Sequence, residues 1–326
     1  MANPINLHEL KYDFNILIKE TADFFNIREV FIEKDYWITS VLKRLAKSKY
    51  VDKVVFKGGT SLSKGYKLID RFSEDVDIAI INIPGMTGNQ LKTLIRNVEK
   101  TISVDLNEID DPLITSKGSR YRKSIFTYQG SDDKKTYQGI SKRLIIEINS
   151  FANPNPFVHR EIKSLIAEFL ESSGRNDLIE RYDLQAFNLN ILDKSRTLTE
   201  KIVALIRFSF SEDPIVSLSG KIRHFYDIYF LLKDSQCRRF FDSETFSSDV
   251  IELIKHDRLA LNEPPGWDQK TISLSPLIND FDMIWGNIKA VYVSELSNLA
   301  FSRIPDEKEV LFSFNEIVRK LSTIPI

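Results

Sequence analysis

The sequence predicts an α/β fold in its first half and a mainly α-helical second half. Residues 51–57 and 75–81 are short apolar, β-branched runs separated by a glycine turn and a helical segment, an alternation typical of the α/β class. After the proline- and asparagine-containing segment 150–157, strand signals fade and apolar residues recur at helical spacing. Because 326 residues exceed one ordinary domain, we expect two, over residues 1–155 and 156–326.

Composition and charge indicate which classes of protein the chain can belong to. No apolar run approaches the length of a membrane span, so we expect a soluble chain without a membrane partner. The net charge of −1 provides no global basic field, and any contact with RNA must therefore come from local patches. Cys237 is the single cysteine and the N-terminus does not resemble a secretory signal. Both observations favour the reducing cytoplasm.

Local signals place the elements of the first half. Helical spacing of apolar residues predicts two helices within residues 8–47. The strand over 51–57 ends at two glycines, and Thr60 or Ser61 is expected to cap a helix over 61–69. Alternation of β-branched residues then predicts a strand over 75–81. A helix over 89–103 and strands over 121–128 and 142–149 complete this half.

The second half contains four clear helical patterns. They cover residues 197–210, 221–233, 277–299 and 306–322. Residues 257–276, which include "NEPPGW", are expected to form an ordered loop between helices.

Two aspartates on the 75–81 strand carry the first chemical signal. Strand alternation places Asp75 and Asp77 on one face, with Val76 and Ile78 on the other. Paired carboxylates are suitable ligands for Mg²⁺, which leaves its remaining positions to water and substrate phosphates. An isolated Asp-x-Asp is more often solvated surface charge.

The glycine turn before this strand carries the second signal. In "GGTS", Gly58 and Gly59 would let the backbone approach an anion closely, and the Thr60 and Ser61 hydroxyls would be donors for phosphate oxygens. Alone, the turn is more simply a capped helix start. Followed by an acidic strand, it favours a site that places phosphate donors beside metal ligands.

The stretch from Gly58 to Asp77, with "RFSEDVD" at 71–77, resembles the signature of the AbiEii/AbiGii nucleotidyltransferase toxins of the polymerase-beta-like superfamily. The resemblance extends to "EKDYW" at 33–37, to "EK" at 200–201 and to "RHFYDIYFLL" at 223–232. It implies a small mixed-sheet nucleotidyltransferase core with N-terminal helices, followed by a helical domain that contributes to the active-site cleft. His224 departs from the pattern, since many relatives have an acidic residue there.

The resemblance assigns roles by position. It implies that Asp75 and Asp77 bind metal and act in catalysis together with Lys201 and Asp227. The candidate nucleotide-binding residues are Gly58, Gly59, Thr60, Ser61 and Lys64. Superfamily members often add a third carboxylate, and the candidate third metal ligand is Glu147.

Each of these assignments has a simpler alternative. Glu147 could belong to an edge strand whose polar side faces water. Lys201 could extend along an apolar helix face to solvent. Arg223 and Asp227 could form a modest surface ion pair at i, i+4. The basic runs at 117–123 and 141–144 could contact RNA phosphates or remain solvated hairpin charge. The four histidines lack metal-ligand spacing, which argues against a zinc site.

These observations predict a cytoplasmic, Mg²⁺-dependent nucleotidyltransferase toxin, with Mn²⁺ as an alternative ion. It would transfer a nucleoside monophosphate from an NTP to an acceptor and release pyrophosphate. The resemblance favours RNA as acceptor, at a tRNA 3′ end, and a separately encoded antitoxin as partner. Alternatives are transfer to a protein, as in adenylylation, a non-catalytic nucleotide- or RNA-binding module, and a metal-dependent nuclease. A nuclease would not need the triphosphate-binding turn.

Overall fold

The chain folds into two compact units. A computed structural model describes residues 5–73, 75–81, 84–129 and 142–324. The first unit comprises Met1–Tyr66 and Phe72–Leu192, and the second comprises Lys67–Arg71 and Asp193–Ile326. This division lies near residue 192, whereas the sequence placed the boundary at residue 155. The difference arises because the chain beyond 155 adds two further strands to the sheet of the first unit.

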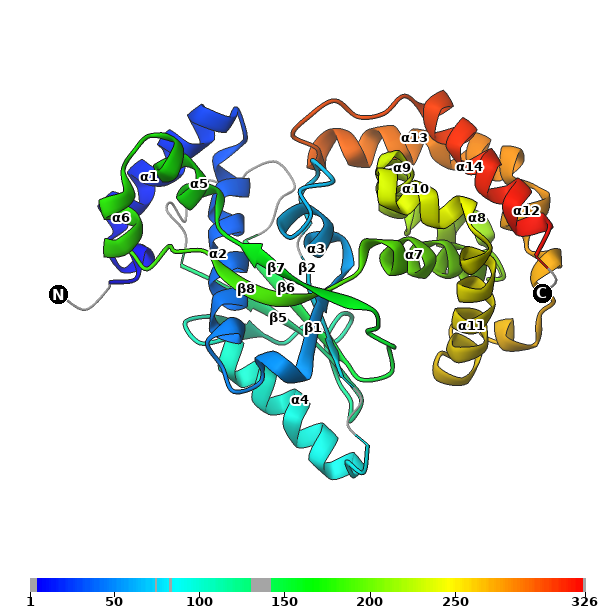
Figure 1. The fold of residues 1–326 in the computed structure, drawn as a ribbon, viewed down its shortest axis with the longest axis horizontal. Helices are drawn as coiled ribbons and strands as arrows, with labels where there is room; N and C mark the ends of the chain where they lie inside the picture. The colour runs from blue at the N-terminus through cyan, green and yellow to red at the C-terminus, as the bar shows by residue number, and fades with distance from the viewer. Residues whose placement is uncertain (1–4, 74, 82–83, 130–141, 325–326) are drawn as a thin grey trace. The chain divides into compact units, whose positions relative to one another are not determined.

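The first unit is built on one mixed sheet, which within the described residues has eight strands (Figure 1). The strands are β1 (Val54–Lys57), β2 (Asp75–Ile80), β3 (Asn107–Ile109), β4 (Ser116–Lys117), β5 (Tyr121–Thr127), β6 (Arg143–Asn149), β7 (Phe157–Ile162) and β8 (Phe187–Leu192). They lie in the order β3-β5-β6-β2-β1-β8-β7, with β4 paired to β5. The acidic strand β2 is therefore central, antiparallel to β1 and parallel to β6.

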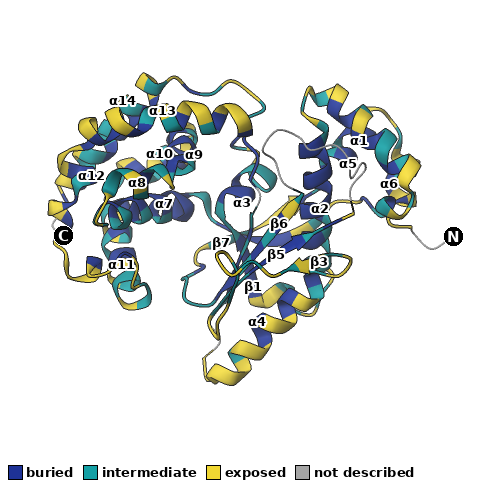
Figure 2. Ribbon diagram, turned by 180° about the vertical axis from the view of Figure 1, so that it is seen from behind, coloured by how far each residue is buried: buried dark blue, intermediate teal, exposed yellow. Residues whose placement is uncertain are grey.

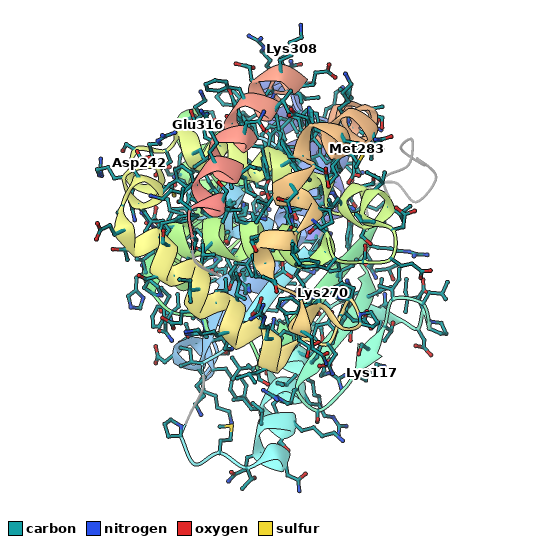
Figure 3. The ribbon with its side chains drawn as sticks, turned by 90° about the vertical axis from the view of Figure 1, so that its right-hand side faces the viewer. Lys117, Asp242, Lys270, Met283, Lys308 and Glu316 are labelled. Atoms are coloured by element: carbon teal, nitrogen blue, oxygen red, sulfur yellow. The ribbon has the colours of Figure 1, made fainter. Side chains whose placement is uncertain are left out.

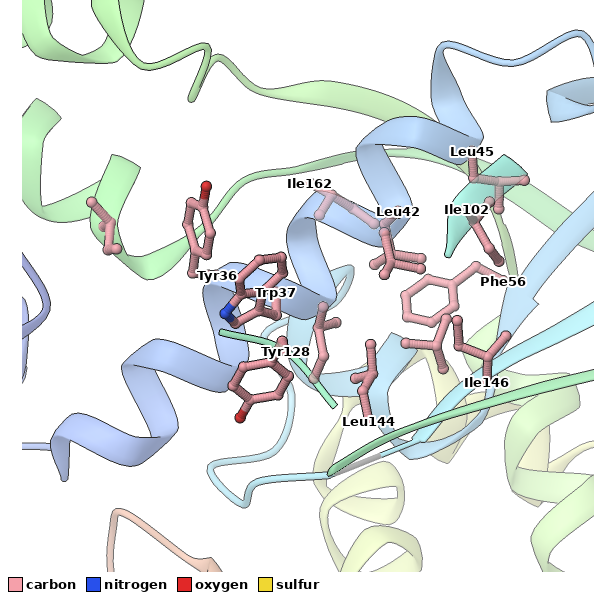
Figure 4. Close-up of a cluster of buried hydrophobic side chains, with 14 of the residues drawn as sticks. Tyr36, Trp37, Leu42, Leu45, Phe56, Ile102, Tyr128, Leu144, Ile146 and Ile162 are labelled. Atoms are coloured by element: carbon pink, nitrogen blue, oxygen red, sulfur yellow. The ribbon is translucent and has the colours of Figure 1, made fainter. Parts of the chain in front are cut away.

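Helices cover the apolar face of this sheet. The helices of the unit are η1 (Leu7–Glu9), α1 (Lys11–Phe25), α2 (Glu29–Ala46), η2 (Val51–Lys53), α3 (Gly58–Lys64), α4 (Gly88–Ile102), α5 (Leu165–Ser172) and α6 (Asn176–Arg181). Trp37 and Leu42 of α2 are fully buried in one core with Phe56 of β1 and Ile146 of β6 (Figure 4). Helix α4 buries one side and exposes the other (Figure 2). This packing leaves the side chains at alternate strand positions on the opposite face.

The helix after the glycine turn differs from its prediction at both ends. It starts at Gly58, before the expected caps, and ends at Lys64. The Thr60 and Ser61 hydroxyls do not cap it, because they donate to the carbonyl oxygens of Asp75 and Gly58. The chain cannot remain helical to residue 69, since Lys67 has a left-handed φ of 50°.

The strands β7 and β8 were missed because the prolines at 154 and 156 were taken to end the sheet region. In β8, Phe187, Leu189 and Ile191 alternate with asparagines, which is a period-two pattern. Strand β7 lies at the edge of the sheet and is largely exposed, and its sequence "FVHREI" therefore carries little apolar signal.

The second unit is helical in its described residues, apart from one isolated bridge between Arg71 and Ala300. Its helices are α7 (Lys194–Phe208), α8 (Pro214–Ser219), α9 (Ile222–Lys233), α10 (Ser235–Asp242), α11 (Glu244–Ala260), η3 (Trp267–Gln269), η4 (Ile272–Leu274), α12 (Pro276–Asn279), α13 (Phe281–Leu299) and α14 (Glu307–Ser322). Stacked and tilted aromatic rings join α9, α13 and α14, namely those of Phe225, Phe281, Trp285 and Phe314. The four predicted helices are confirmed as α7, α9, α13 and α14, and α11 extends into the predicted loop. Among the described helices, none has the length and apolar character needed to cross a membrane.

Candidate active site

Strand β2 places two carboxylates on the sheet face opposite the helix-packed core. Val76 and Ile78 have no exposed surface, whereas Asp75 and Asp77 are half-buried. In the sheet register, Asp77 lies between Lys57 of β1 and Glu147 of β6. Residues directly opposite one another on neighbouring strands have their side chains on the same face. We call Asp75, Asp77 and Glu147 the acidic patch.

The glycine turn fits closely against this patch. A Cβ atom at Gly58 would lie 2.0 Å from Oδ2 of Asp77, and Gly58 has a φ of 77°. Both the space and the backbone conformation therefore require glycine. Two residues later, Thr60 Oγ1 donates a hydrogen bond to the Asp75 carbonyl oxygen at 2.5 Å. The turn and the acidic strand are thus built as one assembly.

The polar side chains of α3 are committed to the protein itself. The Thr60 side chain is 2% exposed, and Ser61, which is fully buried, donates to the Gly58 carbonyl at 2.8 Å. Lys64 Nζ lies 2.5 Å from Oδ1 of Asp35 and donates to the Lys163 carbonyl at 2.7 Å. These contacts favour a structural role for Lys64. The nucleotide-binding role of Gly58, Gly59, Thr60, Ser61 and Lys64 stays a prediction.

Glu147 occupies an interior strand. Strand β6 pairs with β2 on one side and β5 on the other, so the edge-strand alternative is wrong. The Glu147 carboxylate lies 3.6 Å from Lys123 Nζ and close to the Tyr121 hydroxyl. Burial and the negative charges of Glu147, Asp77 and Asp75 raise the pKa of Tyr121. Tyr121 and Lys123 therefore border the acidic patch.

Two carboxylates of the acidic patch fit a divalent metal ion. Across the part of the chain that the structure describes, no group of three or more His, Cys, Asp or Glu side chains is arranged to hold a metal. Two carboxylates at alternate strand positions nevertheless match an ion such as Mg²⁺, which uses one or two protein carboxylates and takes other oxygens from water and phosphates. Asp75 and Asp77 fit this requirement. The third-ligand role of Glu147 stays a prediction, because its carboxylate contacts Lys123 and Tyr121.

Sequence reasoning did not place Tyr121 and Lys123 at this patch. Both belong to the basic run 117–123, which was interpreted only as a possible RNA contact. The signal was available in the alternation of β5, because residues 121 and 123 share a face while Arg122 and Ser124 face the other way and contact Glu99 of α4. What could not be obtained from sequence is the register that sets Lys123 beside Glu147.

The two predicted catalytic residues of the second unit form a buried ion cluster with Arg71. Asp227 accepts from Arg71 Nε and a terminal guanidinium nitrogen at 2.6 Å each, and its Oδ2 lies 2.8 Å from Lys201 Nζ. The side chains of Arg71, Lys201 and Asp227 are 3%, 7% and 0% exposed. The alternative of a solvent-directed Lys201 is therefore wrong, and so is the Arg223–Asp227 surface pair, since Arg223 contacts Glu295 at 2.6 Å.

Charge in this cluster shifts the titration of its members. Burial alone would raise the pKa of Asp227, but Arg71 and Lys201 hold it well below its ordinary value. Asp227 is thus a buried, charged carboxylate that contacts two buried cations. Burial, and next the charge of Lys201, lower the pKa of His224 well below 6.5, so its imidazole is neutral at pH 7. The geometry gives Asp227 the role of a buried counter-charge, and catalytic roles for Lys201 and Asp227 stay predictions.

Comparisons with known proteins identify the family to which the chain belongs. The family described as nucleotidyl transferase AbiEii toxin, type IV toxin–antitoxin system, matches residues 40–306. A solved structure of the nucleotidyltransferase toxin MenT4 from Mycobacterium tuberculosis H37Rv is similar at 13% sequence identity, with a TM-score of 0.44 over 94% of this chain and 98% of that chain. No curated protein matches the sequence.

Proposed function

Because the chain belongs to the AbiEii family of nucleotidyltransferase toxins, we propose that it transfers a nucleoside monophosphate from an NTP to RNA, with a tRNA 3′ end as acceptor. The acceptor hydroxyl oxygen forms a bond to the α-phosphorus. The bond between the α-phosphorus and the oxygen that leads to the β-phosphate breaks, and pyrophosphate leaves.

One observation carries this proposal. The glycine turn and the acidic strand are fitted to each other, since only glycine at position 58 leaves room for the Asp77 carboxylate and Thr60 binds the Asp75 backbone. Phosphoryl transfer depends mainly on positioning and on charge stabilisation. A rigid assembly of a turn and two carboxylates supplies the positioning.

The residues of this assembly have distinct tasks. Asp75 and Asp77 would hold a divalent metal ion, Mg²⁺ in our proposal, which would offset the negative charge of the triphosphate and of the leaving pyrophosphate. The Thr60 hydroxyl fixes the backbone at Asp75. Tyr121 and Lys123 contact Glu147 and hold its carboxylate beside Asp77 in the register.

The biological setting follows from the family description, which names a type IV toxin–antitoxin system. We therefore expect a separately encoded antitoxin to counteract this chain and the cytoplasm to be its site of action. Transfer to a protein acceptor is the alternative that the experiment below separates.

A labelled-transfer survey tests the proposal. The full chain would be incubated with Mg²⁺ and each of the four α-³²P-labelled NTPs, together with total tRNA or with total cellular protein. The proposal predicts label on tRNA from at least one NTP and stoichiometric pyrophosphate. Label on protein alone would replace the proposed acceptor, and shortened tRNA without label would identify a nuclease.

A further inference from the structure

A polar groove lies where helix α4 begins, on the first unit. Its volume is about 720 Å³. It is lined by Met86, Thr87, Gly88, Asn89, Leu91, Lys92, Ser119, Arg120 and Ser150. The lining therefore joins the start of α4 to the residues that precede β5 and follow β6. No Asp or Glu is among these described lining residues.

The groove carries two cations. Lys92 and Arg120 are both exposed, and neither forms an ion pair with a described residue. The backbone around Arg120 is fixed, because its carbonyl oxygen accepts from the Ser150 amide at 3.0 Å and from the Ser150 hydroxyl at 3.2 Å. The groove thus presents two positive charges that no described carboxylate pairs with, beside the hydroxyl group of Ser119, whereas the Thr87 hydroxyl is bonded to Gln90.

The neighbouring cations of the same basic run are neutralised. Lys117 lies 2.8 Å from Glu108, Arg122 lies 2.5 Å from Glu99, and Lys123 faces Glu147. If the run were ordinary solvated hairpin charge, Arg120 would have no reason to differ from these three. Arg120 is thus the cation of the run that remains available to an external anion.

The groove lies at the end of the strands that carry Glu147 and Tyr121, but on the α4 side of the sheet, because Arg120 alternates with Tyr121 and shares a face with Arg122. Ser150 follows Glu147 by three residues and Arg120 directly precedes Tyr121. Three residues of extended strand span roughly 10 Å. An RNA whose reactive end lies at the acidic patch would have to pass around the end of β5 and β6 to bring a backbone phosphate to the groove.

We propose that this groove binds the phosphodiester backbone of the RNA acceptor through Lys92 and Arg120. The inference rests on the proposed function, because it assumes an RNA acceptor. The chemistry favours phosphate over base recognition, since point charges and hydroxyls contact phosphates without reading sequence. The two residues are binding residues and do not contact the reacting atoms.

The test compares the double variant Lys92→Gln/Arg120→Gln with the control Lys117→Gln, which removes a carboxylate-paired lysine from the same hairpin (Figure 3 labels Lys117). Binding of fluorescently labelled total tRNA would be measured from about 0.05 to 0.3 M salt. Each lost phosphate contact should reduce the slope of log K against log salt by about 0.7, which corresponds to roughly fivefold weaker binding per cation at about 0.1 M salt. The control should match the wild type.

Steady-state transfer provides a second readout. The double variant should raise the KM for tRNA by the same factor and leave kcat and the KM for NTP unchanged. If the wild type labels tRNA and the double variant has the tRNA KM of the control, the groove proposal alone is overturned. If the wild type does not label tRNA, the proposed RNA acceptor fails first. If the double variant loses the labelling of a protein acceptor but binds tRNA as tightly as the wild type, the groove proposal is also overturned.

Discussion

Replacing Asp227 by asparagine should destabilise the second unit far more than removing either of its cationic partners. Asparagine has nearly the same shape but no charge, so the buried Lys201 would lose the carboxylate that lies 2.8 Å from its Nζ, and Arg71 would lose two charge-assisted hydrogen bonds. Removing the partner of a buried charge commonly costs about 3–5 kcal/mol. We therefore expect a loss of at least about 4 kcal/mol in the free energy of unfolding of this unit.

Removing Lys201 has a different expected result. Lys201→Met leaves the Arg71–Asp227 pair with its two 2.6 Å hydrogen bonds. Because Asp227 keeps a buried cationic partner and methionine keeps an apolar stem, the cost should stay below about 2 kcal/mol. Loss of the shared carboxylate and loss of one of its cations thus predict an asymmetry between two residues that contact each other.

The assay is urea unfolding combined with hydrogen exchange, read by mass spectrometry on peptides from α7, α9 and β2. Peptides from α7 and α9 report the second unit separately from the sheet, which matters because two units need not unfold together. The control Asp242→Asn makes the same chemical change in an exposed pair with Arg238, where the Asp242 side chain is 54% exposed (Figure 3). It should cost at most about 1 kcal/mol. The reasoning is refuted if Asp227→Asn costs no more than this control, or if Lys201→Met costs as much as Asp227→Asn.

Further predictions concern both units. Gly58→Ala should reduce transfer by on the order of a hundredfold, since the new Cβ would displace Asp77; normal turnover would show that the turn can relax. Glu147→Gln should abolish transfer if Glu147 is a metal ligand, and near-normal rates would assign it to the sheet. Lys201→Met, if Lys201 acts on a phosphate, should lower kcat on the order of a hundredfold while the fold persists; wild-type turnover at saturating NTP and RNA would limit Lys201 to the ion cluster. Unfolding free energy should fall as the pH drops below about 6.5, because the unfolded chain protonates His224 while the folded one, with its lowered pKa, does not. His224→Asn should remove that part of the slope in urea titrations from about pH 7.5 to 5.5, and an unchanged slope would contradict the pKa shift.

Local sequence patterns predicted a structural element correctly where the residues of a single segment determine it. The alternation in β2 placed Asp75 and Asp77 on one face, and the 3.6-residue spacing identified α2, α7 and α9. Boundaries were less certain where tertiary contacts decide them. Helix α3 starts early because Thr60 and Ser61 bind backbone carbonyls, and β7 joins the sheet although its residues are largely exposed.

Partners that are distant in sequence could not be obtained from patterns. Arg71 belongs to the acidic motif in sequence, but its bond to Asp227 spans 156 residues. The sequence around Lys201 is compatible with a lysine that extends to solvent. A lysine is buried at low cost only beside a counter-charge, and that counter-charge comes from a distant part of the sequence. The position of Glu147 beside Asp77 depends on the parallel register of β2 and β6, which single strands do not specify.

The central claim is that the carboxylates on β2 carry out nucleotide transfer. The most direct measurement compares Asp77→Asn with the wild type in pyrophosphate release and in label transfer to tRNA. Hydrogen exchange of β2, measured on both proteins, shows whether the variant is folded. The account predicts that the variant keeps the wild-type protection and loses transfer by at least a factor on the order of a thousand, since asparagine is a poor Mg²⁺ ligand of similar shape. A folded Asp77→Asn variant that transfers label at the wild-type rate would contradict the account.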